Sequence, residues 1–114
     1  MEINMNSEIP EICEKEFEKI VHNEMKGVAC IDFFAEWCMP CLMMSPILED
    51  LAQNMKKHIQ FAKVNISECS SLAEKFGVSS IPTFIVFKNG KEVDRIVGQQ
   101  PADIIEEKLM GLCG

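Results

Sequence analysis

The sequence predicts an α/β fold in which a central mixed sheet of four to five strands is covered by helices on both faces. Three observations lead to this prediction. Short apolar runs of strand length alternate with segments whose apolar residues recur every three or four positions. Residues 28–35 are almost continuously apolar, as in a parallel strand that is buried on both faces. An Asn-Gly pair at 89–90 predicts that the last two strands form an antiparallel hairpin.

The bulk composition is that of an ordinary globular domain, with 114 residues of which 47% are hydrophobic and 25% charged. We therefore expect residues 1–114 to form a single domain, with residues 1–8 as a flexible N-terminal extension. A formal net charge of -7 repels phosphate backbones and anionic lipid headgroups, so neither nucleic acid nor a membrane is an expected partner. The acidic N-terminal stretch has no apolar core of a signal peptide, which favours a cytoplasmic location.

The first half of the chain predicts an arm, a helix, a strand and a long helix. Residues 9–12 read as an edge strand or extended arm, because Pro10 cannot donate to a central ladder. The first helix ends at Gly27 and carries one apolar stripe, formed by Phe17, Ile20, Val21 and Met25. After the strand at 28–35, a helix of about four turns has an inner stripe of Cys41, Met44, Leu48, Leu51 and Met55. Pro46 is expected to kink this helix without ending it, and Met43 and Met44 are expected to fill the core.

The second half predicts a strand, a short helix, a hairpin and a last helix. Residues 59–66 alternate in polarity as a strand, and residues 69–76 form a short helix that ends at Gly77. The hairpin pairs residues 83–88 with residues 91–97. Pro101 is expected to be the first residue of the final helix, whose inner stripe is Ile105, Leu109 and Leu112.

Two features of this pattern carry chemistry. Asp32 lies within an apolar strand and shares a face with Cys30 and Phe34, so its carboxylate points into packed protein, where a charge is costly. Cys38 and Cys41 stand three positions apart where the long helix begins. The other four cysteines are isolated in sequence and are interpreted as small buried hydrophobes or incidental thiols: Cys13, Cys30, Cys69 and Cys113. A regulatory or intermolecular disulfide at Cys69, which opens a predicted helix, is a further hypothesis.

The Cys38–Cys41 spacing predicts thiol-disulfide exchange. At the first turn of a helix, free backbone N–H groups stabilise the thiolate of Cys38 and lower its pKa. Cys41 lies on the same side of that turn, at a side-chain separation of roughly 5 Å, and Pro40 stiffens the segment between them. An inert or metal-binding pair is the alternative, but no second CxxC or CxxH supplies further ligands, so no metal is expected unless a dimer shares one.

Several segments together resemble the thioredoxin family, from about Ile9 onward. The active-site block of that family is similar to Asp32-Phe33-Phe34-Ala35-Glu36-Trp37-Cys38-Met39-Pro40-Cys41. Its third strand, its cis-proline loop and its last hairpin are similar to Lys63-Val64-Asn65-Ile66, to Ile81-Pro82-Thr83, and to Phe87-Lys88-Asn89-Gly90 with Val97-Gly98. This chain departs from the family at three positions: Met39 replaces the usual Gly, Phe34 the usual Trp, and Leu42 the common Lys. The departures leave the reacting groups in place and bear on redox potential and partner choice.

The resemblance implies a thioredoxin fold and a protein thiol-disulfide oxidoreductase that reduces substrate disulfides. It implies that Cys38 is the nucleophile, Cys41 the resolving thiol and Asp32 the proton acceptor for Cys41. Lys63 is the expected charge partner of Asp32. The alternative for Asp32 is a structural carboxylate held by hydrogen bonds and Lys63.

The resemblance also implies a substrate groove that contains a cis Ile81-Pro82 bond. The groove residues are Trp37, Met39, Pro40, Ile81, Pro82 and Gly98, for which ordinary packing and turn chemistry is the alternative. The implied partners are a thioredoxin-reductase-like electron donor and disulfide-containing client proteins. The chain is expected to be a monomer without a cofactor, its redox group being the reversible Cys38–Cys41 disulfide. Two alternative functions are a client-binding module and an isomerase- or oxidase-type member with a shifted redox potential.

Overall fold

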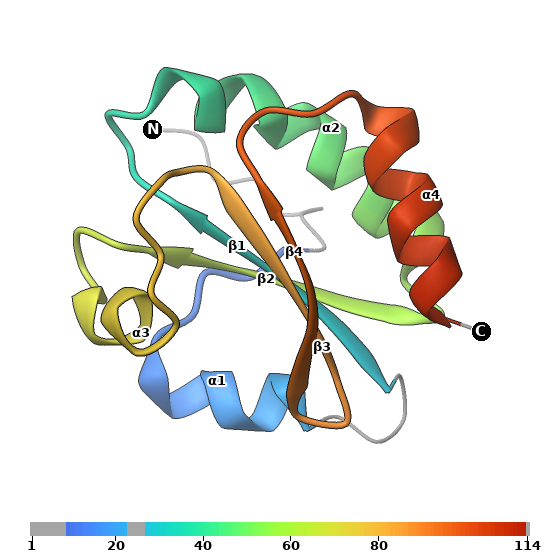
Figure 1. Ribbon diagram of the computed structural model, residues 1–114, viewed down its shortest axis with the longest axis horizontal. Coiled ribbons are helices and arrows are strands. Elements are labelled where there is room, and N and C mark those ends of the chain that lie inside the picture. The colour runs from blue at the N-terminus through green and yellow to red at the C-terminus, as the bar shows by residue number, and fades with distance from the viewer. Residues whose placement is uncertain (1–8, 23–26, 114) are drawn as a thin grey trace.

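The computed structural model describes residues 9–22 and 27–113, and its elements follow the predicted order (Figure 1). The strands of the described sheet are β1 (Val28–Phe34), β2 (Ile59–Asn65), β3 (Thr83–Lys88) and β4 (Lys91–Val97). The helices are α1 (Glu14–Val21), α2 (Met39–Met55), α3 (Ser70–Lys75) and α4 (Ala102–Cys113). The strands lie in the order β2-β1-β3-β4, with β1 parallel to β2 and antiparallel to β3. The predicted α/β fold with a mixed sheet is therefore confirmed.

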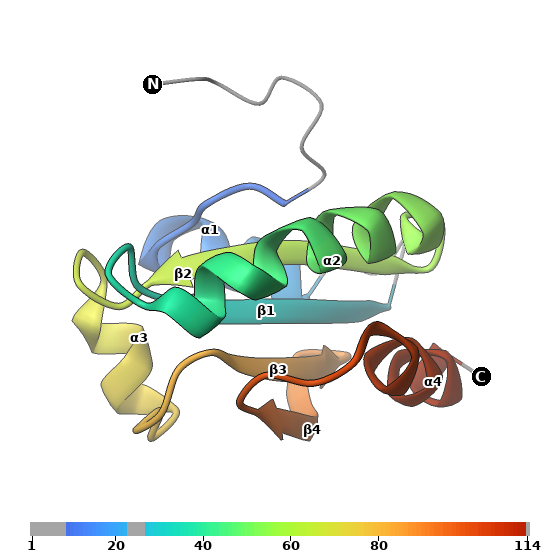
Figure 2. The same ribbon diagram turned by 90° about the horizontal axis from the view of Figure 1, so that it is seen from above.

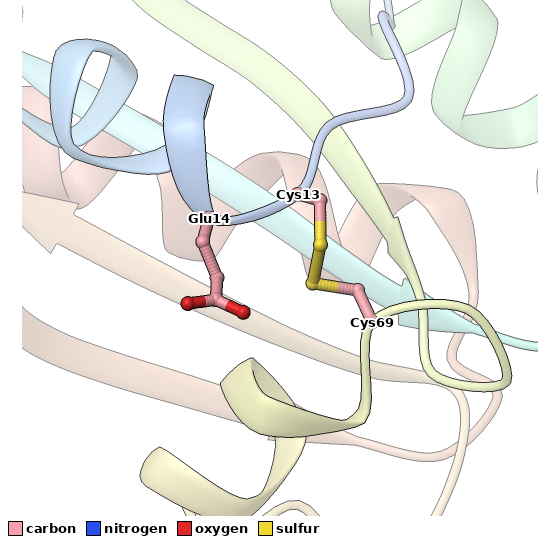
Figure 3. Close-up of side chains that lie close together, drawn as sticks. All are labelled: Cys13, Glu14 and Cys69. Atoms are coloured by element: carbon pink, nitrogen blue, oxygen red, sulfur yellow. A yellow bond between two sulfur atoms is a disulfide. The ribbon is translucent and has the colours of Figure 1, made fainter.

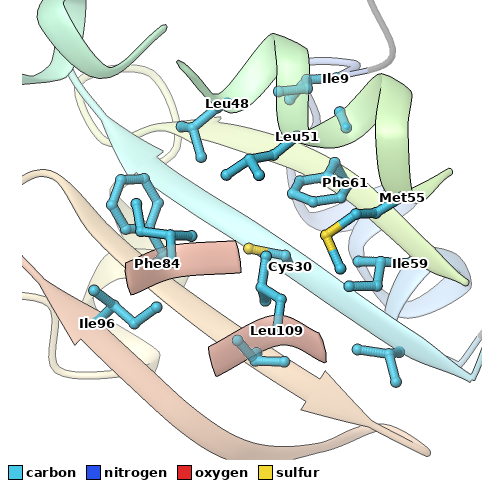
Figure 4. Packing of buried hydrophobic residues seen from close by; sticks show 14 of the residues in the cluster. Ile9, Cys30, Leu48, Leu51, Met55, Ile59, Phe61, Phe84, Ile96 and Leu109 are labelled. Carbon is cyan, nitrogen blue, oxygen red and sulfur yellow. The ribbon is translucent and has the colours of Figure 1, made fainter. Parts of the chain in front are cut away.

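Helices cover both faces of this sheet (Figures 1 and 2). Residues of α2 and α4, such as Leu48 and Leu109, pack with Cys30, Phe61 and Phe84 on one face (Figure 4). A second buried cluster joins α1 and α3 to the opposite face; its members include Phe17, Leu72, Ile31, Val64 and Phe87. The alternation expected for the strand at 59–66 is confirmed, because Phe61 and Val64 belong to different clusters.

The N-terminal arm lies along the outer edge of β2. Glu11 forms a single parallel bridge with Lys63. The amide of Ile12 donates to the Lys63 carbonyl at 2.8 Å, and the Lys63 amide donates to the Pro10 carbonyl at 2.9 Å. Residues 9–12 thus form the extended arm that Pro10 indicated, rather than a full strand. Residues 1–8, expected as a flexible extension, lie outside the described residues.

Three helix predictions differ from the structure in detail. α1 ends at Val21, earlier than the predicted limit at Gly27, and Met25 lies outside the described residues. α4 begins at Ala102 and not at Pro101, because the Pro101 carbonyl caps the helix by accepting a hydrogen bond from the Ile105 amide at 3.3 Å. α2 continues through Pro46, so the proline does not end the helix; the kink stays a prediction.

The hairpin forms where the Asn-Gly pair predicted it. Asn89 and Gly90 have φ angles of 54° and 82°, the left-handed values that a two-residue type I′ turn needs. The hairpin brings the end of β4 back toward the loop before β3, where the Gly98 amide donates to the Pro82 carbonyl at 2.8 Å. Because Thr83 at the start of β3 pairs with Phe33 near the end of β1, that loop lies beside the carboxyl end of β1.

Candidate active site

Cys38 occupies the N-cap of α2, directly after the turn that follows β1. Its backbone is extended, with φ -87° and ψ 106°, and its Sγ accepts a hydrogen bond from the Cys41 amide at 3.2 Å. The Cys38 amide donates to the Ala35 carbonyl at 3.2 Å, which closes the turn. The sulfur thus faces the free N–H groups and the positive end of a 17-residue helix. These groups favour a thiolate at Cys38 when the pair is reduced.

Cys38 and Cys41 are joined by a disulfide in this structure, with their Cα atoms 5.3 Å apart. Both residues are buried and cluster with Ala35, while Ile66 and Ile81 pack against them. Pro40 is exposed in the first turn of α2, where its missing N–H breaks no helical hydrogen bond. The structure therefore brings the two predicted cysteines together at bonding distance in an apolar setting.

Asp32 lies on β1, beside Lys63 in the parallel register with β2. Its Oδ1 is fully buried and has no hydrogen-bond partner among the described residues. Burial raises the pKa of Asp32 to about 7, against the opposing effect of the positive charge of Lys63. A carboxyl whose pKa lies near neutral pH can accept or release a proton there.

Lys63 is held on both sides by backbone pairing, to β1 on one side and to the arm on the other. Its Nζ lies 5.5 Å from the centre of the Phe34 ring, a cation-π distance. The lysine is half-buried, so its charge acts on Asp32 through a partly desolvated region.

The residues of the predicted groove lie around the cysteine pair in two groups. Trp37 and Met39 are 72% and 66% exposed beside Cys38. The Ile81-Pro82 peptide is cis, as the resemblance implied, and Ile81 packs against the cysteines. Gly98 has a φ of +86°, and nothing lies within 4 Å of where a Cβ would project. The backbone at Gly98 is consequently open to an approaching chain.

The exposed apolar surface at the start of α2 is larger than the sequence indicated. Leu42 and Met43 are 54% and 58% exposed, next to Met39 on the same helix. Met44 is buried, but the expectation that Met43 fills the core is wrong. The apolar stripe of α2 repeats every three to four residues and includes position 44, which leaves position 43 on the outer face.

A second disulfide joins Cys13 to Cys69, across a sequence separation of 56, with Cα atoms 5.8 Å apart. The interpretation of these two cysteines as small buried hydrophobes or incidental thiols is therefore wrong, and the disulfide of Cys69 is intramolecular rather than intermolecular. The arm along β2 carries Cys13 to the edge where the turn after β2 places Cys69. Sequence spacing holds no signal for such a pairing, although both cysteines directly precede a helix. Cys30 and Cys113 remain free thiols.

The sequence of this chain is similar to those of one protein family. The sequence model of the Thioredoxin family matches residues 8–110. Thioredoxin from Chlamydia caviae is 53% identical over 77 residues, covering 68% of this chain and 74% of that protein. Thioredoxin 2 from Chlorobaculum tepidum is 38% identical over 105 residues, covering 92% of this chain and 95% of that protein.

Solved structures show the same likeness. A mutant thioredoxin from Halobacterium salinarum is similar with a TM-score of 0.86 at 26% identity, covering 100% of this chain and 97% of that one. The oxidised form of mitochondrial thioredoxin 3 from Saccharomyces cerevisiae is similar with a TM-score of 0.81 at 29% identity, covering 90% of this chain and 94% of that one. Within the described residues, no helix is long and apolar enough to span a bilayer.

Proposed function

The chain belongs to the thioredoxin family and is a thiol-disulfide oxidoreductase, and from this premise we propose how its residues divide the reaction. Cys38 is the nucleophile, Cys41 is the resolving thiol and Asp32 is the proton acceptor. The observation that carries this proposal is the N-cap position of Cys38, whose Sγ accepts a hydrogen bond from the Cys41 amide at 3.2 Å. That hydrogen bond and the helix N-terminus favour the anion of Cys38 over that of Cys41.

Reduction of a client disulfide then takes two steps. The Cys38 thiolate attacks one client sulfur, a mixed disulfide forms, and the other client sulfur leaves as a thiolate. Cys41 next gives its proton to Asp32 and attacks Cys38 Sγ. The Cys38–Cys41 disulfide forms and the second client sulfur leaves, so two electrons pass from the dithiol to the client.

Asp32 suits the second step because its pKa of about 7 lies near neutral pH. Lys63 keeps that pKa from rising further, since its positive charge favours the carboxylate. In this proposal Lys63 is a positioning residue that acts through Asp32. Without Lys63, more of the Asp32 carboxyl would be protonated at neutral pH and unable to accept a proton.

The client segment lies extended between two walls in this proposal. Trp37 and Met39 supply exposed apolar area on one wall. Pro40 restricts the backbone of the first turn of α2 next to them. Ile81, the cis Pro82 and the open backbone at Gly98 form the other. Contacts through the backbone and through apolar side chains admit clients of varied sequence, which suits a general disulfide reductase.

We also propose the setting of the reaction. The chain acts as a single-domain monomer, takes electrons from a thioredoxin-reductase-like donor and passes them to disulfide-containing proteins without a bound cofactor. A cytoplasmic location fits a dithiol that must be kept reduced between cycles. Cell fractionation after an acid quench measures the location of the protein. Alkylation of free thiols in each fraction measures the redox state of Cys38 and Cys41.

The test of the enzymatic proposal is dithiothreitol-driven reduction of insulin, followed by turbidity. Wild type should accelerate the reaction well above the uncatalysed rate, and Cys38→Ser should reduce it to that rate. Cys113→Ser is the matched control, since Cys113 is a half-buried free thiol on α4 outside the proposed site. Equal rates for wild type and Cys38→Ser would remove Cys38 from the reaction.

A second candidate function is a client-binding module, which the exposed apolar side chains at the start of α2 favour: Trp37, Met39, Leu42 and Met43. An unfolded client that binds equally well to wild type and to the Cys38→Ser/Cys41→Ser variant would support it. Loss of binding in that double variant would tie client capture to the thiols instead.

A further inference from the structure

The Cys13–Cys69 disulfide lies outside the reaction described above. Figure 3 shows the bond between the segment that enters α1 and the segment that enters α3, with Glu14 beside it. Cys13 is the N-cap of α1 and Cys69 is the N-cap of α3. The bond thus fastens Cys13, which directly follows the N-terminal arm of residues 9–12, to the turn that follows β2.

Other contacts hold the same segments together independently of the sulfur bond. The Ser71 hydroxyl donates to the Glu14 carboxylate, which joins α3 to α1. The rings of Phe17 and Phe76 lie 5.3 Å apart between the same two regions. The Ile12 amide donates to the Lys63 carbonyl, a backbone hydrogen bond that does not involve the sulfurs. A reduced pair would consequently stay close enough to re-form the bond.

The bond is also within reach of a small reductant. Cys13 is half-buried, and both cysteines line an open pocket together with Glu11, Glu16 and Glu68. The pocket is acidic because these three glutamates line it, and burial together with the negative charge of Glu68 raises the pKa of Glu11. An acidic rim repels the thiolate of glutathione, which also carries carboxylates, more than the singly charged thiolate of dithiothreitol.

Both ends of the bond border segments that lead to the active site. On the arm side, backbone hydrogen bonds flank Lys63, the neighbour of Asp32 in the sheet. On the other side, the Cys69 amide donates to the Asn65 carbonyl at 2.8 Å. The Asn65 side chain in turn donates to Glu36 at 3.5 Å, in the turn before Cys38.

We propose that Cys13 and Cys69 form a second dithiol-disulfide couple, separate from Cys38–Cys41, which when oxidised clasps the N-terminal arm against β2. A dithiol reductant attacks Cys13 Sγ, Cys69 leaves as a thiolate, and the second reductant thiol then displaces Cys13. The protein gains two electrons and two protons, and the reductant becomes a disulfide. The couple goes beyond the proposed function and does not depend on it.

The couple is measured in the Cys38→Ser/Cys41→Ser variant, which removes exchange with the active site. The folded variant is equilibrated in buffers of graded reduced-to-oxidised dithiothreitol ratio, quenched in acid, unfolded and alkylated, and its cysteines are mapped by mass spectrometry. We expect alkylation of Cys30 and Cys113 alone in oxidising buffers, with Cys13 and Cys69 added together in reducing buffers. Circular dichroism at each ratio must show that the protein stays folded.

The second couple should need a more reducing buffer than the active site. Wild type is titrated in parallel, and we expect the midpoint ratio for Cys13–Cys69 to be on the order of tenfold higher than for Cys38–Cys41, because the acidic pocket does not stabilise thiolates as α2 does. Three outcomes would overturn the proposal: no Cys13–Cys69 bond in any buffer, a bond that opens only when the protein unfolds, or an equal midpoint for both pairs.

Amide hydrogen exchange in the same variant, with the Cys13–Cys69 bond either formed or reduced, measures how firmly the arm is held against β2. The amides of Ile12 and Lys63, which bond the arm to β2, should exchange about tenfold faster once the bond is open. The Asn89 amide, which donates to the Gly27 carbonyl, serves as the control and should not change. Unchanged exchange at Ile12 and Lys63 would show that the bond does not clasp the arm.

Discussion

Replacing Asp32 by asparagine should stabilise the protein at alkaline pH and leave its stability at acidic pH nearly unchanged. The buried carboxyl has a folded pKa of about 7 against an ordinary value of 3.8. Between these two values the folded chain binds a proton that the unfolded chain has lost. Stability therefore falls as the pH rises through this window, by about 1.4 kcal/mol for each pH unit. Asparagine has the same shape and does not titrate.

The magnitude follows from the same numbers. Between pH 5 and the folded pKa of about 7, wild type should lose about 3 kcal/mol of unfolding free energy through this group, and the Asp32→Asn variant should lose none of it. Urea unfolding of the oxidised proteins at pH 5 and pH 8 measures the difference. Asp50→Asn, on the exposed face of α2, is the matched control and should follow wild type. If Asp32→Asn and wild type change equally between the two pH values, Asp32 does not carry the raised pKa.

Three further predictions test neighbouring parts of the site. Lys63→Met should raise the pKa of Asp32 above its wild-type value, because the cation that lowers it is gone, and the stability loss should move to higher pH in the same urea experiment. Leu42→Lys should lower the pKa of the Cys38 thiol by adding a positive charge in the first turns of α2, and the pH dependence of iodoacetamide alkylation measures it, with Leu42→Met as the uncharged control. Cys13→Ser should lower the free energy of unfolding by about 4 kcal/mol through the loss of a bond that closes a loop across 56 positions; an unchanged urea midpoint would contradict that.

The sequence was informative about the fold wherever local pattern and tertiary position agree. The stripe from Cys41 to Met55 repeats at helical spacing, and each of its members is buried in α2. The Asn89-Gly90 pair needs left-handed backbone, which few other residue pairs adopt readily, so the turn was visible without any knowledge of the rest of the chain. Periodicity does not define where a helix stops, which explains the errors at Val21 and Pro101.

The same distinction holds for the site: the sequence indicates contacts within one element, but not contacts between distant segments. Cys38 and Cys41 are neighbours on one helical turn, so their spacing alone predicted that they meet. Asp32 was conspicuous as a lone acid in an apolar strand. Cys13 and Cys69 meet only because the arm pairs with β2, and a contact across 56 positions leaves no periodic trace. The cis Ile81-Pro82 bond was likewise implied by family resemblance and not by the residues themselves.

Trapping the mixed disulfide tests the division of labour between the two cysteines most directly. Cys41→Ser retains the nucleophile but cannot resolve the intermediate, so a disulfide-bonded peptide should remain covalently attached through Cys38, as found by mass spectrometry of the quenched protein. Cys38→Ser under the same conditions should carry no peptide at Cys41, because Cys41 lies beyond the helix N-cap, where its thiolate is less stabilised than that of Cys38. A peptide attached at Cys41 in Cys38→Ser, or no adduct at Cys38 in Cys41→Ser, would contradict the assignment of Cys38 as the attacking thiol.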